Sequence, residues 1–134
     1  MGTNRLRTAL IGGLAAVAST AVLALPTAAH ASAQAWMCTE GNVCAYSGAN
    51  GTGKVCAWPL DDPDWQGGHN ACSWSATTPV RSVYNNGDTG RPVAFYTGAE
   101  YTGRRVTCTA AGARGNFSEN GGAGVLLRSH KWEC

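Results

Sequence analysis

The chain has 134 residues, and its ten Lys and Arg against eight Asp and Glu give a formal net charge of +2 at pH 7. Two of the basic residues, Arg5 and Arg7, belong to an N-terminal leader, so the rest of the chain is electrically balanced. No stripe of basic residues remains, which argues against a nucleic-acid partner or an anionic membrane surface.

Residues 1–31 have the pattern of a secretory signal peptide. Arg5 and Arg7 precede an uncharged apolar run from Thr8 to Leu25, and the small residues Ala29 and Ala31 follow. Cleavage after Ala31 or Ala33 fits this pattern. A transmembrane helix is the alternative, but the run is only marginally long enough. We therefore expect a secreted, extracellular protein whose residues 32–134 form a single domain and stay off the membrane once the leader is removed.

A duplicated segment organises the exported part. VCAYSGANGTGK at residues 43–54 recurs as VAFYTGAEYTGR at residues 93–104, with six identities. Each copy reads as a short strand, a glycine-rich turn and a second strand. The duplication predicts two structural motifs that share one core, motif 1 at about residues 38–85 and motif 2 at about residues 91–134.

The segments between and after the copies are short and rich in turn residues. The pattern predicts a strand at residues 81–84, a turn at residues 85–90, a glycine-rich loop at residues 112–124 and a last strand at residues 125–127. One helical turn is expected near residues 64–66, and no window has helical periodicity with caps. The expected fold class is therefore all-β.

Six cysteines in the exported part predict about three disulfides. Sequence alone allows fifteen pairings. Cys38 and Cys44 are close in sequence, so we expect them to pair. Cys56 and Cys108 lie in the second strands of the two copies, so we expect each to pair with the later cysteine of its own copy, Cys72 and Cys134 respectively. A zinc site that includes His69 and His130 is the alternative, but no CxxC spacing supports it. We expect no metal and no cofactor.

The aromatic and glycine spacing of the copies resembles the Greek-key signature of the βγ-crystallins. Tyr96, Tyr101 and Gly103 carry the pattern in the second copy, and Tyr46 and Gly53 carry it in the first, where Gly51 replaces the middle aromatic. The resemblance implies a Greek-key sandwich of two repeated motifs. Many such motifs bind calcium through residues that include two side-chain hydroxyls. In the first motif Arg81 replaces one of these hydroxyl residues, and in the second motif Ala123 and Gly124 replace both, so we expect weak or absent calcium binding.

Within that superfamily the chain resembles peptidase inhibitor family I36, typified by a Streptomyces metalloproteinase inhibitor. The resemblance rests on the leader, on the close pair Cys38 and Cys44, on SVYN at residues 82–85 and on RVTC at residues 105–108. It implies a monomeric protein that inhibits an extracellular protease, and metalloproteinases are the class it points to. We expect the protein not to be an enzyme, because its sequence has no nucleophile-elbow motif, HExxH motif or phosphate loop and its cysteines are expected to be paired. The implied reactive segment is rigid and substrate-like: Arg105, Val106, Thr107, Cys108, Thr109 and Ala110.

The resemblance places the reactive bond between Cys108 and Thr109. The family has a further cysteine five residues beyond that bond, whereas this chain reads TAAGARG after Cys108, so only Cys134 can clamp the segment. Cys108 as a purely structural bridge end is the alternative reading.

A second function class is an antimicrobial or cell-wall and carbohydrate-binding protein without inhibitory activity. It would act through an exposed face formed by several of the five tryptophans. Because the exported part has no isoleucine and few leucines, core burial is the more natural use for most of these rings.

Overall fold

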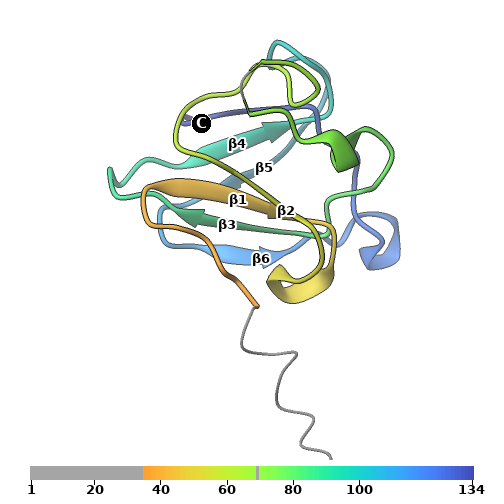
Figure 1. Ribbon diagram of the computed structural model, residues 1–134, viewed down its shortest axis with the longest axis horizontal. Coiled ribbons are helices and arrows are strands. Elements are labelled where there is room, and N and C mark those ends of the chain that lie inside the picture. The colour runs from red at the N-terminus through yellow and green to blue at the C-terminus, as the bar shows by residue number, and fades with distance from the viewer. Residues whose placement is uncertain (1–34, 69) are drawn as a thin grey trace, which may run out of the picture.

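The computed structural model describes residues 35–68 and 70–134, so the predicted leader (residues 1–31) and His69 lie outside the described residues. Two antiparallel sheets face each other (Figure 1). Strands β2 (Val55–Trp58), β1 (Asn42–Tyr46), β3 (Ser82–Asn86) and β6 (Arg114–Asn116) form one sheet in that order, and β5 (Arg105–Thr109), β4 (Val93–Tyr96) and β7 (Ser129–Lys131) form the other. The fold is all-β, as predicted.

Three short 3₁₀ turns connect the strands: η1 (Ala49–Gly51), η2 (Ser73–Ala76) and η3 (Glu119–Gly122). Within residues 35–68 and 70–134, no helix has the length and apolar character needed to cross a membrane.

The two motifs exchange strands. β6 belongs to the second motif in sequence but pairs with β3 of the first, Val83 opposite Gly115. In return, Asp62 of the first motif forms an isolated bridge with His130 of β7. This crossing is the Greek-key connection that the sequence predicted, and it means that each motif completes the sheet of the other.

The duplication extends to individual hydrogen bonds. Ser82 Oγ donates to Gly48 O at 2.7 Å and accepts from Gly51 N at 2.9 Å. Ser129 Oγ repeats both contacts in the second motif, donating to Gly98 O at 2.6 Å and accepting from Tyr101 N at 3.1 Å. The two folded hairpins are therefore closed by the same device, which confirms the repeated motif.

A glycine at the end of each hairpin takes a backbone conformation that is costly for other residues. Gly53 and Gly103 have φ of 80° and 73°. A Cβ at Gly103 would collide with Thr97 Oγ1, and one at Gly53 with Ser47 Oγ. These two hydroxyls accept hydrogen bonds from the residues after the glycines, so the collision would disturb the turn itself.

Aromatic rings supply much of the core between the sheets. Trp58 and Trp65 are buried and stacked with ring centroids 4.4 Å apart, and Phe95 packs edge-on against Trp65 at 6.2 Å. Valines from both sheets, among them Val43 and Val93, complete the cluster. This aromatic core agrees with the shortage of large aliphatic residues in residues 32–134.

One predicted strand was wrong, and one predicted loop contains a strand. Val125 forms only an isolated bridge with Val80, and the last strand is β7, three residues with the sequence SHK. The expected loop at residues 112–124 contains β6, whose side chains are all exposed. Neither strand has the run of apolar residues by which a strand is recognised in a sequence. The buried side chains of β7 are polar, and β6 is held by backbone pairing.

The helical turn expected near residues 64–66 is present only as a single hydrogen-bonded turn, in which Gly67 N donates to Asp64 O at 2.9 Å, and no 3₁₀ or α-helix is formed there. Asp62 Oδ1 accepts from Asp64 N at 2.9 Å, and Asp64 Oδ1 accepts from Gln66 N at 3.0 Å. These side-chain contacts two residues along the chain compete with helix formation, and the nearest 3₁₀ turn is η2.

Candidate functional site

The predicted reactive segment lies on an edge strand. Residues 105–109 are β5, which pairs with β4 on one side and has no strand on the other. A strand paired on one side leaves alternate N–H and C=O groups of its outer edge open to another chain. The segment is therefore extended and accessible along one edge rather than a protruding loop.

Side chains alternate along this strand except at one extra residue. The register shifts between Phe95 and Tyr96, so Val106 has no direct partner on β4. Arg105 and Cys108 are exposed, Val106 and Thr107 are half-buried, and Thr109 is only 9% exposed. Ala110 is exposed and leaves the strand.

Cys108 and Cys56 are not equivalent. Trp58 pairs with Val43 and Thr109 pairs with Val93, so the position in β2 that matches Cys108 is Ala57. Cys56 faces the core and bonds to buried Cys72, whereas Cys108 lies on the outer face and bonds to Cys134. All three predicted disulfides, including Cys38–Cys44, are present.

Several contacts pin the segment in place. Besides the Cys108–Cys134 bridge, Arg105 Nη1 donates to Cys134 O at 3.2 Å. Asn85, a fully buried residue of β3, donates from Nδ2 to Thr109 O at 3.0 Å and to Arg91 O at 2.9 Å. Cys134 thus holds β5 at Arg105 and Cys108, and Asn85 of the first motif holds its last residue, Thr109.

The chain turns sharply after Ala110. Ala113 N donates to Ala110 O at 3.0 Å, and Gly112 N donates to Asn85 O at 2.8 Å. A hollow of about 240 Å³ opens between β5 and β6, lined by residues of both strands and by buried Phe117. The outer edge of β5 therefore borders open space.

The structure describes only one of the two histidines that were considered for a zinc site. His69 lies outside the described residues. His130 is fully buried and accepts a hydrogen bond at Nδ1 from Trp65 Nε1 at 2.8 Å, while Nε2 lies 2.9 Å from Leu60 O. Because an indole N–H only donates, Nδ1 must be unprotonated and Nε2 carries the hydrogen. Burial lowers the pKa of His130 to about 4.

No cluster of three or more His, Cys, Asp or Glu suited to a metal occurs in the part of the chain that the structure describes. The Arg81 side chain fills the place of the expected hydroxyl ligand, and its Nε donates to Gly122 O at 3.0 Å. A guanidinium at that point opposes the binding of a cation.

The tryptophans do not form one exposed face. Trp58, Trp65 and Trp132 are buried, and Trp36 and Trp74 are half-buried. The Arg114 guanidinium lies 5.3 Å from the centre of the Trp36 ring and 5.6 Å from that of Tyr84. The sugar-stacking face considered from the sequence is therefore not formed, and core burial of most rings is confirmed.

Sequence reasoning missed two residues that bear on this site. Asn85 belongs to the SVYN segment, but only the structure gives it a role in holding Thr109. Leu60 is a lone leucine in a polar, proline-flanked connection, and it proves to be 74% exposed. An apolar residue between two prolines in an otherwise acidic stretch was the available signal.

Comparisons with known proteins agree with this geometry. The model of peptidase inhibitor family I36 matches residues 31–108, more than half of the chain. No curated protein sequence shows significant similarity to it.

Among solved structures, the chain is similar to a βγ-crystallin domain studied for the evolution of the eye-lens fold, with a TM-score of 0.53 and 12% identity over 69% of this chain and 85% of that one. It is also similar to geodin, a βγ-crystallin from Geodia cydonium, with a TM-score of 0.40 and 21% identity over 69% of this chain and 48% of that one. The first likeness shows that the fold is that of a βγ-crystallin domain.

Proposed function

The chain belongs to peptidase inhibitor family I36, and from this we propose that it is exported and, as a monomer, inhibits an extracellular peptidase through residues 105–110. The observation that carries the proposal is the position of these residues on a free sheet edge that is fixed at both ends. The family resemblance favours a metalloproteinase as the target.

The extended shape of β5 suits a peptidase cleft. Peptidases bind substrates as extended strands, and an edge strand offers the same row of backbone donors and acceptors. Because β4, Asn85 and the Cys108–Cys134 bridge already hold the segment in this shape, it loses little conformational entropy on docking. The contact energy then contributes to affinity instead of offsetting an ordering cost.

The same contacts would make cleavage unproductive. If the bond between Cys108 and Thr109 were cut, Cys108 would stay attached to Cys134 through the disulfide. Thr109 would stay paired with Val93, and its carbonyl would keep its hydrogen bond from Asn85. Both new ends would remain close together, so religation competes with release.

A substitution on the exposed edge tests the proposal. Ala110→Lys places a long charged side chain beside β5 at a residue whose own side chain faces solvent. Inhibition of thermolysin-like and subtilisin-like peptidases should be stoichiometric for the unchanged protein and at least tenfold weaker for this variant. Ser118→Lys, at another exposed residue, is the matched control. Equal inhibition by both variants would move the contact away from residues 105–110.

A further inference from the structure

The connection after β2 displays the most exposed large apolar side chain in the described part of the chain. We name residues 59–64 the Leu60 loop. Leu60 is 74% exposed, against 63% for Met37 and 47% for Leu126. Hollows of about 300 Å³ and 220 Å³ lie beside it, one lined also by Trp132 and the other by Trp58 and Asn70. Leu60 therefore stands out between two depressions.

The backbone beneath Leu60 is held by the second motif at each step. His130 Nε2 donates to Leu60 O at 2.9 Å, and Trp132 N donates to Asp61 Oδ1 at 2.7 Å. Asp62 exchanges two backbone hydrogen bonds with His130, at 3.0 and 3.1 Å. Leu60 is therefore an exposed apolar side chain carried on a constrained backbone.

The far end of the Leu60 loop is fixed in the same way. Pro63 O accepts from Glu100 N at 2.7 Å, and Arg128 Nε donates to Asp64 Oδ1 at 2.6 Å. Pro59 and Pro63 also restrict their own φ angles. The loop therefore has little freedom left to lose on binding a partner.

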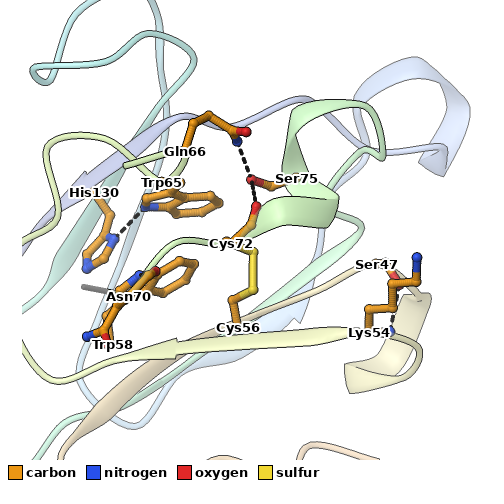
Figure 2. The surroundings of a disulfide bond; sticks show 10 residues. All are labelled: Ser47, Lys54, Cys56, Trp58, Trp65, Gln66, Asn70, Cys72, Ser75 and His130. Atoms are coloured by element: carbon orange, nitrogen blue, oxygen red, sulfur yellow. Dashed lines mark hydrogen bonds between the residues drawn. A yellow bond between two sulfur atoms is a disulfide. The ribbon is translucent and has the colours of Figure 1, made fainter. Parts of the chain in front are cut away.

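A rigid support lies under the start of the loop (Figure 2). Trp58 stacks on Trp65, and its Nε1 donates to Asn70 O at 3.0 Å. The Cys56–Cys72 bridge ties β2 to the segment before η2, and Trp65 donates to His130. Figure 2 shows these groups gathered on one side of the bridge, with His130 beside the stacked indoles.

The Leu60 loop is the counterpart, in the first motif, of residues 110–115, which begin at the last residue of the proposed reactive segment in the second. Trp58 occupies the register position of Thr109, because each pairs with the first valine of its own motif, Val43 and Val93. Pro59 and Leu60 thus follow β2 as Ala110 and Ala111 follow β5. Each segment is held by the other motif, one through His130 and one through Asn85.

We propose that the Leu60 loop is a second peptidase-binding segment, in which Leu60 enters an apolar subsite of a peptidase that prefers a bulky aliphatic residue. This inference rests on the proposed function and adds the side chain that selects the target. On β5, Thr109 is small and buried and Val106 is half-buried against the core, so neither side chain is as exposed as Leu60.

Inhibition constants for matched leucine variants test this proposal. The unchanged protein, Leu60→Ala and Leu126→Ala are each titrated against a thermolysin-like peptidase, which selects bulky apolar residues. Loss of a leucine from an apolar subsite should weaken inhibition about 10- to 100-fold. Leu126→Ala should leave inhibition unchanged, and Leu60→Met, which conserves volume, should retain it to within about threefold.

The outcomes separate this inference from the proposed function. Unchanged inhibition by Leu60→Ala, together with a loss in Ala110→Lys, would overturn the role of Leu60 and leave residues 105–110 as the inhibitory segment. An equal loss in Leu60→Ala and Leu126→Ala would also overturn it, because the effect would then be general. Absence of inhibition by the unchanged protein against both peptidase classes would overturn the proposed function, and this inference with it.

Discussion

Protonation of His130 should destabilise the fold between about pH 6.5 and pH 4. Its imidazole is fully buried among Trp58, Trp65 and Phe95, with Nδ1 accepting from Trp65 and Nε2 facing Leu60 O. A proton added at Nδ1 would point at the indole N–H, a second donor, and would place a charge in an apolar core. The folded state therefore resists protonation.

The size of the effect follows from the pKa. Burial lowers the pKa of His130 from 6.5 to about 4, which corresponds to about 3 kcal/mol. Because the unfolded chain binds the proton more readily in this interval, stability is complete above pH 6.5 and falls as the pH drops toward 4. For a domain of this size that loss is a large share of the total stability.

Urea unfolding followed by tryptophan fluorescence at several pH values between 7.5 and 4 measures this loss. His130→Gln is the reference variant, because its amide can accept from Trp65 and donate to Leu60 O without titrating. Every other ionisable residue is the same in the two proteins, so the difference between them isolates His130. The unchanged protein should lose about 3 kcal/mol of unfolding free energy relative to His130→Gln as the pH falls from 7.5 to 4. Parallel curves for the two proteins would refute the reasoning.

Four further variants probe the repeated motif and the candidate site by the same unfolding assay. Ser82→Ala and Ser129→Ala each remove a hydroxyl that makes two hydrogen bonds, so each should cost about 1–3 kcal/mol; a change below about 0.5 kcal/mol would mean that water replaces the hydroxyl. Replacing both Cys108 and Cys134 by serine opens a bridge between residues 26 apart in sequence and should cost about 3 kcal/mol while near-ultraviolet circular dichroism keeps its native form; unchanged stability would show that β5 needs no clamp. Glu100 has a φ of 54°, so Glu100→Asn, matching Asn50 in the first copy, should gain about 0.5 kcal/mol, and a loss would contradict this account of the hairpin.

The sequence was sufficient to predict the parts of the fold that are local. The two hairpins follow from the repeated aromatic and glycine spacing, because a positive φ at Gly53 and Gly103 is a requirement that the residue type itself reveals. The Cys38–Cys44 bridge follows from proximity along the chain. Features of this kind need no knowledge of which strands pair.

The strands that join the two motifs could not be predicted from hydrophobic patterning. β7 is buried through Ser129 and His130, both fully enclosed and hydrogen-bonded, so its sequence resembles a surface loop. β6 has no buried side chain at all. Patterning reports where apolar surface is hidden, whereas these strands are positioned by backbone pairing with distant partners.

The orientation of the candidate site depends on a single residue. Val106 has no direct partner on β4, and the register shift at this point turns Cys108 to the outer face while Cys56 faces inward. Equal numbering of the two copies would have placed both cysteines on the same face. A bulge of this kind is visible only once the pairing is known.

The exchange of strands also explains why both proposed binding segments are rigid although neither lies in a protruding, self-contained loop. In each motif a backbone carbonyl at or just after the end of the second strand is held by a buried polar side chain of the other motif, that of Leu60 by His130 and that of Thr109 by Asn85. A binding segment supported only by its own hairpin could loosen without unfolding the domain. Here loosening either segment requires the two motifs to separate, so the stability of the whole core resists it.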